Sequence, residues 1–589
     1  MITAKDLKLM LQKPLHFLLK IEVLKDDGKT ILDTLKGVVI GGTASIDSAS
    51  SIRRTFSASL IPTLHDNNNT KITEEGLVWL NKELRIYVGV MDIRTGTYTY
   101  YPLGHYVYTS SSGSYDAATN QLTITCSDYM SKLDGTKNGQ IGAFTTRIPA
   151  YEENAQTGEI IKHNIIREAV ISVLKQSGGI DRYMVDDMGE YKALPQNNED
   201  WKNYRAQNPL WNAIPYDLEF SSGCTVLSIL ETLRDLYPHY EMFFDKYNVF
   251  TCRMIPSCYK DDIIFSNEFL QRIYISENTS IDMTAVRNIC EVWGKVIEAD
   301  FYTEQCSYQN NIYHCSIDGY DEAYYNGDTV AVKIPSANAA NPKLDINHLG
   351  AIPILDENTE SPVARLALEK DAVFVFKIKS KRTEGQTTYN AYLLGHWQAH
   401  GMNVLTDGTV GSDYTFQDGT ICPRYSKKYF QKKYNCESVE LEIIPNSPFT
   451  VQKLGEIPDI KTGGDYDHIT SDSLALSRAK WENWKNSRLT DSITLTTNLV
   501  PFYDVNLKVL YQTSCSSAPK QYIIKSVSHD FSSGTSTLSL MKFYPLYDDI
   551  IREMGTHRAL SNYKHGTLSQ YTHHKLTELI GQYEVTPHL

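Results

Sequence analysis

Two histidines stand four residues apart in the segment HWQAH, at His396 and His400. On a helix this spacing would place both imidazoles on one face, as in the zinc-binding motif of a metalloprotease. The glutamate that serves as general base in that motif is absent, because Trp397 follows the first histidine. The flanking LLG and GMN are typical of a strand end and a turn. The sequence therefore favours an ordinary structural role for this segment. The alternative is that the two histidines bind the metal of a metal-dependent enzyme.

Two acidic segments, residues 318–328 and 463–468, could offer oxygen ligands to a cation such as Ca²⁺. Their candidate side chains are Asp318, Asp321, Glu322 and Asp328 in the first segment and Asp465, Asp467 and His468 in the second. Neither segment has the residue order of an EF-hand loop. A solvated acidic loop is the commoner structure for such a pattern. The sequence therefore predicts no metal site, no cofactor site and no catalytic residue.

Gly41 and Gly42 open the segment GGTASIDSASSIRRTFSASLIPT. Glycine-rich loops can present backbone N–H groups to phosphate, but the lysine and the helix that a phosphate-binding loop requires are missing. From Ser51 the residues alternate with the period of a strand. One face would carry Ile52, Arg54, Phe56, Ala58 and Leu60. We expect a turn at the glycines, followed by a strand whose hydroxyl face and Arg53 meet a neighbouring subunit or a lumen wall.

The charge balance argues against a nucleic-acid partner. The 589 residues carry 57 basic and 70 acidic side chains, which gives a formal net charge of −13. Such a chain repels polyphosphate unless it has a basic stripe. The dense basic run RYSKKYFQKK, at Arg424–Lys433, is interpreted as a solvated strand or loop. A chain of this length is also expected to form roughly three to four domains.

The numbers of cysteines and tyrosines further narrow the class of protein that this chain can be. The ten cysteines are scattered and none forms a CxxC pair, which predicts free thiols rather than a disulfide framework. No window approaches the ~20 apolar residues that span a bilayer, and the charged N-terminal segment does not resemble a signal peptide. The 39 tyrosines outnumber the 18 phenylalanines. Tyrosine has an amphipathic ring that suits protein contact surfaces, so this excess is typical of a protein with extensive contact surface.

Hydrophobic periodicity predicts strand-rich ends around a mixed middle. A short helix is expected at 3–13, with Thr3 and Asp6 in capping-box spacing. It precedes strands at 15–24, 31–40 and 84–93 and further strands up to residue 127. Helical spacing follows at 162–176 and 225–236, and the second of these helices leads into a hairpin with a turn at 245–248. Strands return from about residue 281. A helix at 471–488 precedes four closing strands.

The expected fold is therefore a β-rich α+β protein, with two tube-like antiparallel β-barrels flanking an α/β module. The predicted boundaries are 1–135 for the N-terminal barrel, 136–280 for the helix-hairpin module, 281–548 for the second barrel and 549–589 for a C-terminal tail.

Several segments together resemble phage tail hub proteins. LRIYVGV and YPLGHYVYTSSSGSYDAATNQLTITCSDYMSKLDG are similar to their N-terminal barrel, in which a PLG strand precedes a strand ending in DxMxxLD. DLEFSSGCTVLSILETLRDLYPHYEMFFDKYNVFTCRMIP resembles their helix-plus-hairpin module. LALSRAKWENWKNSRLTDSITLTTNLVPFYDVN and YIIKSVSHDFSSGTSTLSLMKFYP resemble the helix and closing strands of their second barrel. The resemblance extends roughly over residues 30–548.

This resemblance implies a structural hub of a bacteriophage tail tip or baseplate. In the family, a homotrimer with two barrels per chain adapts the six-fold tail tube or distal tail ring to three-fold tip components. The implied partners are distal tail or tail tube proteins, the tape-measure protein and tip or fibre proteins, with DNA only as transient cargo. Such a protein belongs to the virion and is made in the host cytoplasm.

Because the chain ends soon after KFYP, we expect any lytic domain to be a separate chain. Two alternatives of other classes stay open. One is a cell-wall-degrading enzyme that uses a metal at His396 and His400. The other is a host receptor-binding module, which the abundance of tyrosine favours.

Overall fold

The computed structural model describes residues 2–543 with internal gaps. The gaps are residues 26, 37–38, 62–77, 80, 143–145, 155–159, 190–208, 238–239, 256–262, 283, 321, 358–359, 364, 366, 369, 371, 384–385, 468, 470 and 488–489. The expected C-terminal tail at 549–589 lies outside the described residues. None of the described helices has the length and apolar character needed to cross a bilayer.

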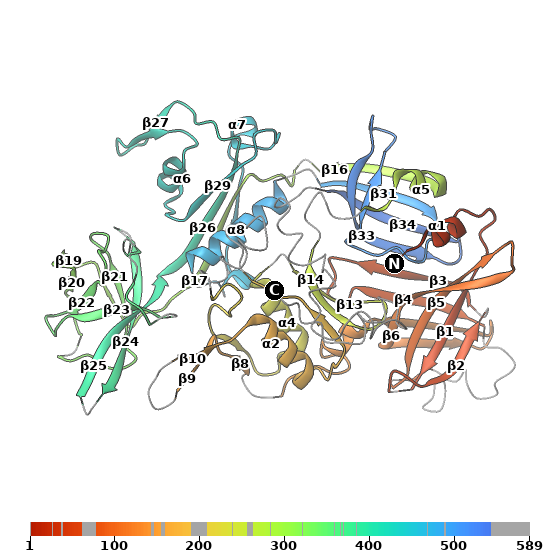
Figure 1. Cartoon of the computed structure of the whole chain (residues 1–589), viewed down its shortest axis with the longest axis horizontal. Coiled ribbons are helices and arrows are strands. Elements are labelled where there is room, and N and C mark those ends of the chain that lie inside the picture. The colour runs from red at the N-terminus through yellow and green to blue at the C-terminus, as the bar shows by residue number, and fades with distance from the viewer. Residues whose placement is uncertain are drawn as a thin grey trace, which may run out of the picture.

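A 13-stranded sheet, called the main sheet below, contains strands from both ends of the chain (Figure 1). Its strands are β1 (Phe17–Leu24), β2 (Ile31–Lys36), β3 (Val39–Asp47), β4 (Arg54–Leu60), β5 (Glu83–Asp92), β6 (Thr97–Asp116), β7 (Gln121–Ser127), β15 (Ile263–Phe265), β16 (Tyr274–Asp282), β31 (Thr490–Asn498), β32 (Lys508–Tyr511), β33 (Lys520–Asp530) and β34 (Thr535–Lys542). The order is β16-β31-β34-β33-β3-β4-β7-β6-β5-β1-β2, and β32 and β15 branch from β33.

The pairing of β3 with β33 joins the N-terminal and C-terminal strands. The two strands run antiparallel, with Thr43 opposite Asp530 and Asp47 opposite Ser526. Buried side chains from both groups of strands belong to one apolar core, which includes Phe56 and Phe531 at a ring separation of 6.3 Å. The main sheet is therefore a single packed unit.

The expected turn at Gly41 and Gly42 is wrong, because both glycines lie inside β3. The register of β3 against β4 shifts between Val39 and Gly41, which marks a bulge. A Cβ on Gly42 would meet the carbonyl oxygen of Ser57 at 2.4 Å. Glycine is needed here because the neighbouring strand approaches so closely.

Two short helices pack on the main sheet. Helix α1 (Ala4–Met10) begins with the capping box that the sequence predicts, in which the Asp6 backbone N–H donates to Thr3 Oγ1 at 3.2 Å and the Thr3 N–H to Asp6 Oδ2 at 2.8 Å. Helix α5 (Asn267–Ile273) buries Phe269, Leu270 and Ile273 in the same core.

The predicted helix-plus-hairpin module is present beneath the main sheet. Its elements are β8 (Thr146–Ile148), β9 (Tyr151–Glu153), β10 (Ile160–His163), α2 (Ile166–Ser172), η2 (Val173–Ser177), β11 (Tyr183–Val185), β12 (Leu218–Phe220), α4 (Val226–Asp235), β13 (Tyr240–Phe244) and β14 (Phe250–Met254). The first helix begins later than predicted, because residues 160–163 pair with β9. The hairpin β13–β14 and β11 form a three-stranded sheet in which all five side chains of β13 are buried.

Residues 289–486 form two larger sheets and a two-stranded sheet of β27 and β28 on the left of Figure 1. The first, called the covered sheet, has four strands in the order β29 (Val439–Ile443), β26 (Gln398–Thr406), β17 (Ile289–Val296) and β30 (Pro458–Lys461). Helix α8 (Asp472–Asn486) lies across it, at the position predicted from the sequence. The other elements of this region are β27 (Asp413–Thr415), β28 (Ile421–Pro423), α6 (Lys427–Tyr434), α7 (Val451–Leu454) and η3 (Gly464–Tyr466).

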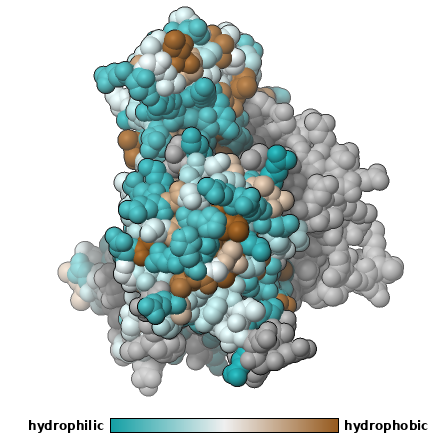
Figure 2. All heavy atoms as spheres, turned by 90° about the vertical axis from the view of Figure 1, so that its left-hand side faces the viewer, coloured by the Kyte–Doolittle hydropathy of each residue, from teal (hydrophilic) through white to brown (hydrophobic). Residues whose placement is uncertain are grey.

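The second, called the outer sheet, has eight strands and projects from the covered sheet. Its order is β18 (Phe301–Thr303), β21 (Thr329–Lys333), β24 (Val373–Thr383), β25 (Gln386–His396), β23 (Ile352–Asp356), β22 (Lys343–Ile346), β20 (Ile312–Cys315) and β19 (Cys306–Gln309). Figure 2 shows this side of the molecule as mainly hydrophilic with scattered apolar residues.

The prediction of a β-rich chain with few helices is confirmed, whereas the division into two barrels stays a prediction. The interpretation of the basic run at 424–433 as a strand or loop is wrong, because residues 427–434 form helix α6. This helix buries Tyr429 and Phe430, while its lysines remain on the outer side. Because lysines dominate this segment of the sequence, its two buried residues, Tyr429 and Phe430, do not stand out as the apolar side of a helix.

Candidate functional site

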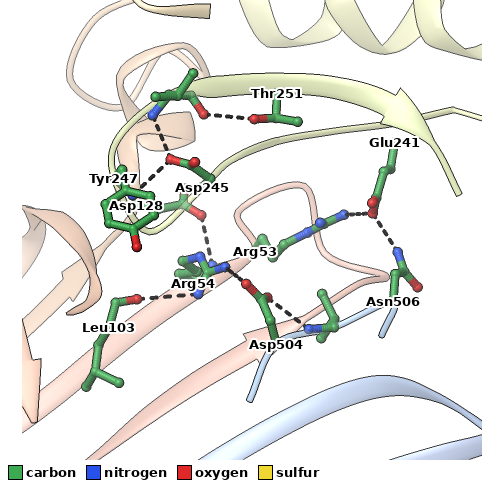
Figure 3. Close-up of polar contacts among 12 residues, drawn as sticks. Arg53, Arg54, Leu103, Asp128, Glu241, Asp245, Tyr247, Thr251, Asp504 and Asn506 are labelled. Atoms are coloured by element: carbon green, nitrogen blue, oxygen red, sulfur yellow. Dashed lines mark hydrogen bonds and ion pairs between the residues drawn. The ribbon is translucent and has the colours of Figure 1, made fainter. Parts of the chain in front are cut away.

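Arg53 immediately precedes β4 and Arg54 begins it, and both are buried, with 4% and 2% of their surface exposed. Figure 3 shows that each guanidinium meets a carboxylate from a distant part of the chain. Neighbouring residues of a strand point in opposite directions. The pair therefore reaches two different partners. We call the group Arg53, Arg54, Asp128, Glu241, Asp504 and Asn506 the polar junction.

Arg53 binds the middle module through Glu241 of β13. Arg53 Nη2 lies 2.7 Å from Glu241 Oε2, and Asn506 Nδ2 donates to the same oxygen at 2.5 Å. The other oxygen, Oε1, accepts from Arg253 Nε at 2.8 Å. The Arg53 guanidinium also lies 4.0 Å from the centre of the Phe243 ring, in cation–π geometry. One carboxylate thus joins the main sheet, the module and the segment before β32.

Arg54 binds the segment after β31 and the end of β7. Arg54 Nη2 lies 2.6 Å from Asp504 Oδ2, and its backbone N–H donates to Asp128 Oδ2 at 2.8 Å. Asp128 caps the short helix η1 (Tyr129–Lys132) by accepting the Met130 N–H at 3.0 Å. The remaining Asp504 oxygen accepts the Val505 N–H at 2.9 Å.

The carboxylates facing arginine are held in their charged form. Burial raises the pKa of Glu241, but the guanidinium groups of Arg53 and Arg253 outweigh burial, so the pKa lies below its ordinary value. Burial likewise opposes ionisation of Asp504, and Arg54 reverses the effect and lowers its pKa. Both ion pairs are therefore charged at neutral pH.

In Asp128, unlike in Glu241 and Asp504, the effect of burial on the pKa outweighs the effect of the hydrogen-bond donors and nearby positive charges. Burial raises its pKa to about 6, although the N–H groups of Arg54 and Met130 donate to it and lower the pKa in part. The guanidinium of Arg54 is directed at Asp504 and not at Asp128. Asp128 is therefore the titrating member of the polar junction.

The polar junction can fix the parts of the chain relative to one another. Each carboxylate oxygen of Glu241, Asp128 and Asp504 accepts at least one hydrogen bond, so these side chains are held in place. The expectation that Arg53 faces a neighbouring subunit or a lumen wall is wrong, because Glu241 buries it within the chain. A single acid within the apolar strand YEMFF was the sequence signal for its partner.

His396 and His400 are separated by the structure. His396 ends β25 and Gln398 begins β26, so the helical arrangement of a zinc motif is not formed. The strand end expected at LLG is present, whereas the turn expected at GMN is wrong, because residues 401–403 lie inside β26. His396 Nδ1 contacts the Asp472 carboxylate of α8. His400 Nε2 lies 2.9 Å from Glu291 Oε1 and stacks on Trp293 with ring centres 3.6 Å apart. His396 therefore links the outer sheet to α8, and His400 joins two strands of the covered sheet.

The acidic segments form no metal site in the part of the chain that the structure describes. Asp328 Oδ2 accepts the Tyr320 hydroxyl at 2.9 Å. Asp321 and His468 lie outside the described residues.

Among the described residues, one group of three histidine and carboxylate side chains lies close enough to bind a metal ion. It consists of His314, Asp345 and His348 in the outer sheet. This group could not be predicted from the sequence, because His314 is distant from the other two residues in the chain. The DxxH spacing in DINH was the available signal.

Comparison with known proteins gives a family match over a minor part of the chain. Residues 446–547 match a family described as "Domain of unknown function (DUF5048)". This stretch includes α8 and the closing strands β31–β34. No curated protein matches the chain.

Three solved structures are similar over most of their length. The 43 kDa tail protein of prophage MuSo2 from Shewanella oneidensis is 9% identical with a TM-score of 0.40, covering 90% of this chain and 98% of that one. A tail protein from Neisseria meningitidis MC58 is 7% identical with a TM-score of 0.40, covering 90% and 99%. Prophage tail protein gp18 from Listeria monocytogenes EGD-e is 8% identical with a TM-score of 0.35, covering 89% and 94%.

Proposed function

We propose that this chain is a structural hub of a bacteriophage tail tip or baseplate. In this proposal three copies form a ring that adapts a six-fold tail tube or distal tail ring to three-fold tip components. The sequence segments that resemble phage tail hubs support it. Those segments lie in β5–β7, in the α4 and β13–β14 module, and in α8 and β31–β34.

The two end strands of the main sheet carry the proposal. Among the described strands, β2 pairs only with β1 at one end of the main path, β16 pairs only with β31 at the other, and β15 ends the branch through β32. Both ends expose large apolar side chains, Ile31 and Leu32 on β2 and Tyr274 and Ile275 on β16, each at least 42% exposed. An apolar strand edge left open favours pairing with another chain.

Two different ends on one sheet suit a head-to-tail contact. If β16 of one protomer pairs with β2 of the next, the contact is heterologous and a ring forms when the rotation closes. Closure after three protomers would give two tube-like halves per chain around a channel. The polar junction would keep the two halves in a fixed relation within each protomer.

The proposed partners are distal tail or tail tube proteins, the tape-measure protein and tip or fibre proteins. DNA would pass the channel as cargo, and the net charge of −13 disfavours tight binding to it. The proposed location is the virion tail tip or baseplate. We propose no enzymatic activity and no cofactor, since His396 and His400 each contact a separate carboxylate.

Light-scattering mass measurement combined with electron-microscopy class averages tests the proposal. We expect a three-fold ring with a central channel as the protein concentration rises. Ile275→Lys, placed on the β16 edge, should abolish the ring. Ile421→Lys, at a similarly exposed site on β28 (59% against 47% for Ile275), should not. A monomer at every concentration, with no ring after cross-linking, would contradict the proposal, as would an intact ring in Ile275→Lys.

A further inference from the structure

The outer sheet brings together three potential metal ligands that are separate in sequence. Strands β20 and β22 run parallel, and their register places His314 directly beside Asp345. His348 follows β22 after one intervening turn residue. The ligand atoms of the three side chains all lie within 4.8 Å of one another. The sheet pairing and the turn thus make a compact group of two imidazoles and one carboxylate.

The carboxylate oxygen Asp345 Oδ2 is the centre of the group. His314 Nδ1 lies 2.8 Å from it and His348 Nδ1 lies 3.8 Å from it. Two ligand atoms of a tetrahedral Zn²⁺, each about 2.0–2.1 Å from the metal, lie about 3.3 Å apart. The two separations from Asp345 Oδ2 bracket this value, and the ligand atoms of the two histidines lie within 4.8 Å of each other, so side-chain rotations would complete the coordination geometry.

The second oxygen of the carboxylate is held by the backbone. Asp345 Oδ1 accepts the Gly350 N–H at 3.1 Å, which leaves Oδ2 directed at the imidazoles. Such an outer hydrogen bond fixes the orientation of a metal-binding carboxylate. The carboxylate itself is almost buried, with 9% of its side chain exposed.

The turn that carries His348 is also fixed. Asn347 and His348 both adopt left-handed backbone conformations, with φ of 48° and 61°. The Asn347 side chain accepts the Ile317 N–H at 2.9 Å and donates to the Ile317 carbonyl at 2.9 Å. These bonds tie the turn to the chain just after β20. His348 is therefore held near Asp345, although 89% of its side chain is exposed.

We propose that His314, Asp345 and His348 bind a divalent transition metal of the zinc class, with water completing the coordination on the exposed side. Two nitrogen donors and one oxygen donor suit Zn²⁺, whereas Ca²⁺ and Mg²⁺ require oxygen ligands. The metal would replace the direct contact between His314 Nδ1 and Asp345 Oδ2 and would link β20, β22 and the following turn. This site is independent of the ring contacts proposed above.

Calorimetric titration of the metal-free full-length chain with Zn²⁺ tests the site. His348→Asn removes the imidazole but keeps a residue that tolerates the left-handed conformation. His16→Asn is the matched control. His16 is also exposed, but it immediately precedes β1 of the main sheet and is not part of the outer sheet. Histidines at 549–589 could add background binding, and all variants retain them.

We expect His348→Asn and Asp345→Asn each to weaken one Zn²⁺-binding event at least tenfold, and His16→Asn to leave it unchanged. Co²⁺ should give visible absorption in the wild type that both site variants lose. Identical isotherms and spectra for all variants would overturn the proposal. Displacement of Zn²⁺ by equimolar Ca²⁺ would also overturn it, since that result requires an oxygen site.

Discussion

The Arg54 guanidinium lies 2.6 Å from the Asp504 carboxylate, although the two residues are 450 positions apart. Arg53 beside it reaches Glu241, 188 positions away. These two ion pairs connect the N-terminal strands with the middle module and with the C-terminal strands. The polar junction therefore holds the N-terminal strands, the middle module and the C-terminal strands of the protomer together.

Glu241→Gln should strongly destabilise the protein. The change leaves the buried Arg53 and the half-buried Arg253 without a counter-charge, and removing one partner of a buried ion pair costs about 3–5 kcal/mol. Glu219→Gln is the control, because Glu219 is exposed and faces Arg147 only at 3.9 Å. An exposed pair of this kind contributes about 0–1 kcal/mol. Urea unfolding measures both effects, and equal stability of the two variants would contradict the role of the junction.

Asp128→Asn should change how stability depends on pH. The folded protein holds the pKa of Asp128 at about 6, above the value for an unfolded chain. The folded state therefore binds the proton more tightly, and the contribution of Asp128 to stability falls as the pH rises from 4 through 6.

We expect wild-type stability to fall relative to Asp128→Asn over this range by about 2 kcal/mol. Urea unfolding at several pH values measures the difference between the two proteins. Parallel pH profiles would show that Asp128 does not titrate in this way.

Gly401→Ala should displace α8 from the covered sheet. A Cβ at this position would meet the Leu476 backbone nitrogen at 2.2 Å and the Ala475 carbonyl carbon at 2.5 Å. Backbone atoms cannot rotate away, so overpacking of this kind costs about 1–3 kcal/mol or more.

Gly411→Ala is the matched control, because its nearest neighbour is the Arg424 Cβ at 3.1 Å. Thermal unfolding should separate the two variants, and tryptophan fluorescence should report the change at α8, which carries Trp481 and Trp484. An unchanged melting temperature for Gly401→Ala would contradict the close packing of α8.

Mild oxidation should join Cys306 and Cys315. They are opposite each other in the antiparallel pair β19–β20, with sulfur atoms 2.8 Å apart. Oxidised glutathione would take up the two electrons and two protons as the disulfide forms. Mass spectrometry should show the loss of two hydrogens in a peptide pair containing both residues. Cys306→Ser should abolish this product and Cys515→Ser should not; a bond involving Cys515 instead would contradict the pairing.

Local sequence determined many of the individual elements. The Thr3 and Asp6 spacing predicted the cap of α1, and the alternation from Arg54 to Leu60 predicted the buried face of β4. Helices α4 and α8 and the closing strands also lie where periodicity placed them. These features could be predicted because capping and side-chain periodicity depend on residues only a few positions apart.

Only the tertiary structure decided which distant elements meet. The pairing of β3 with β33 and the carboxylate partners of Arg53 and Arg54 join residues hundreds of positions apart. His314 likewise becomes a neighbour of Asp345 only through the register of β20 on β22. Strand pairing and ion pairing over such separations leave no local period in the sequence. They follow from how the sheets pack, because packing selects which edges and charges come within contact distance.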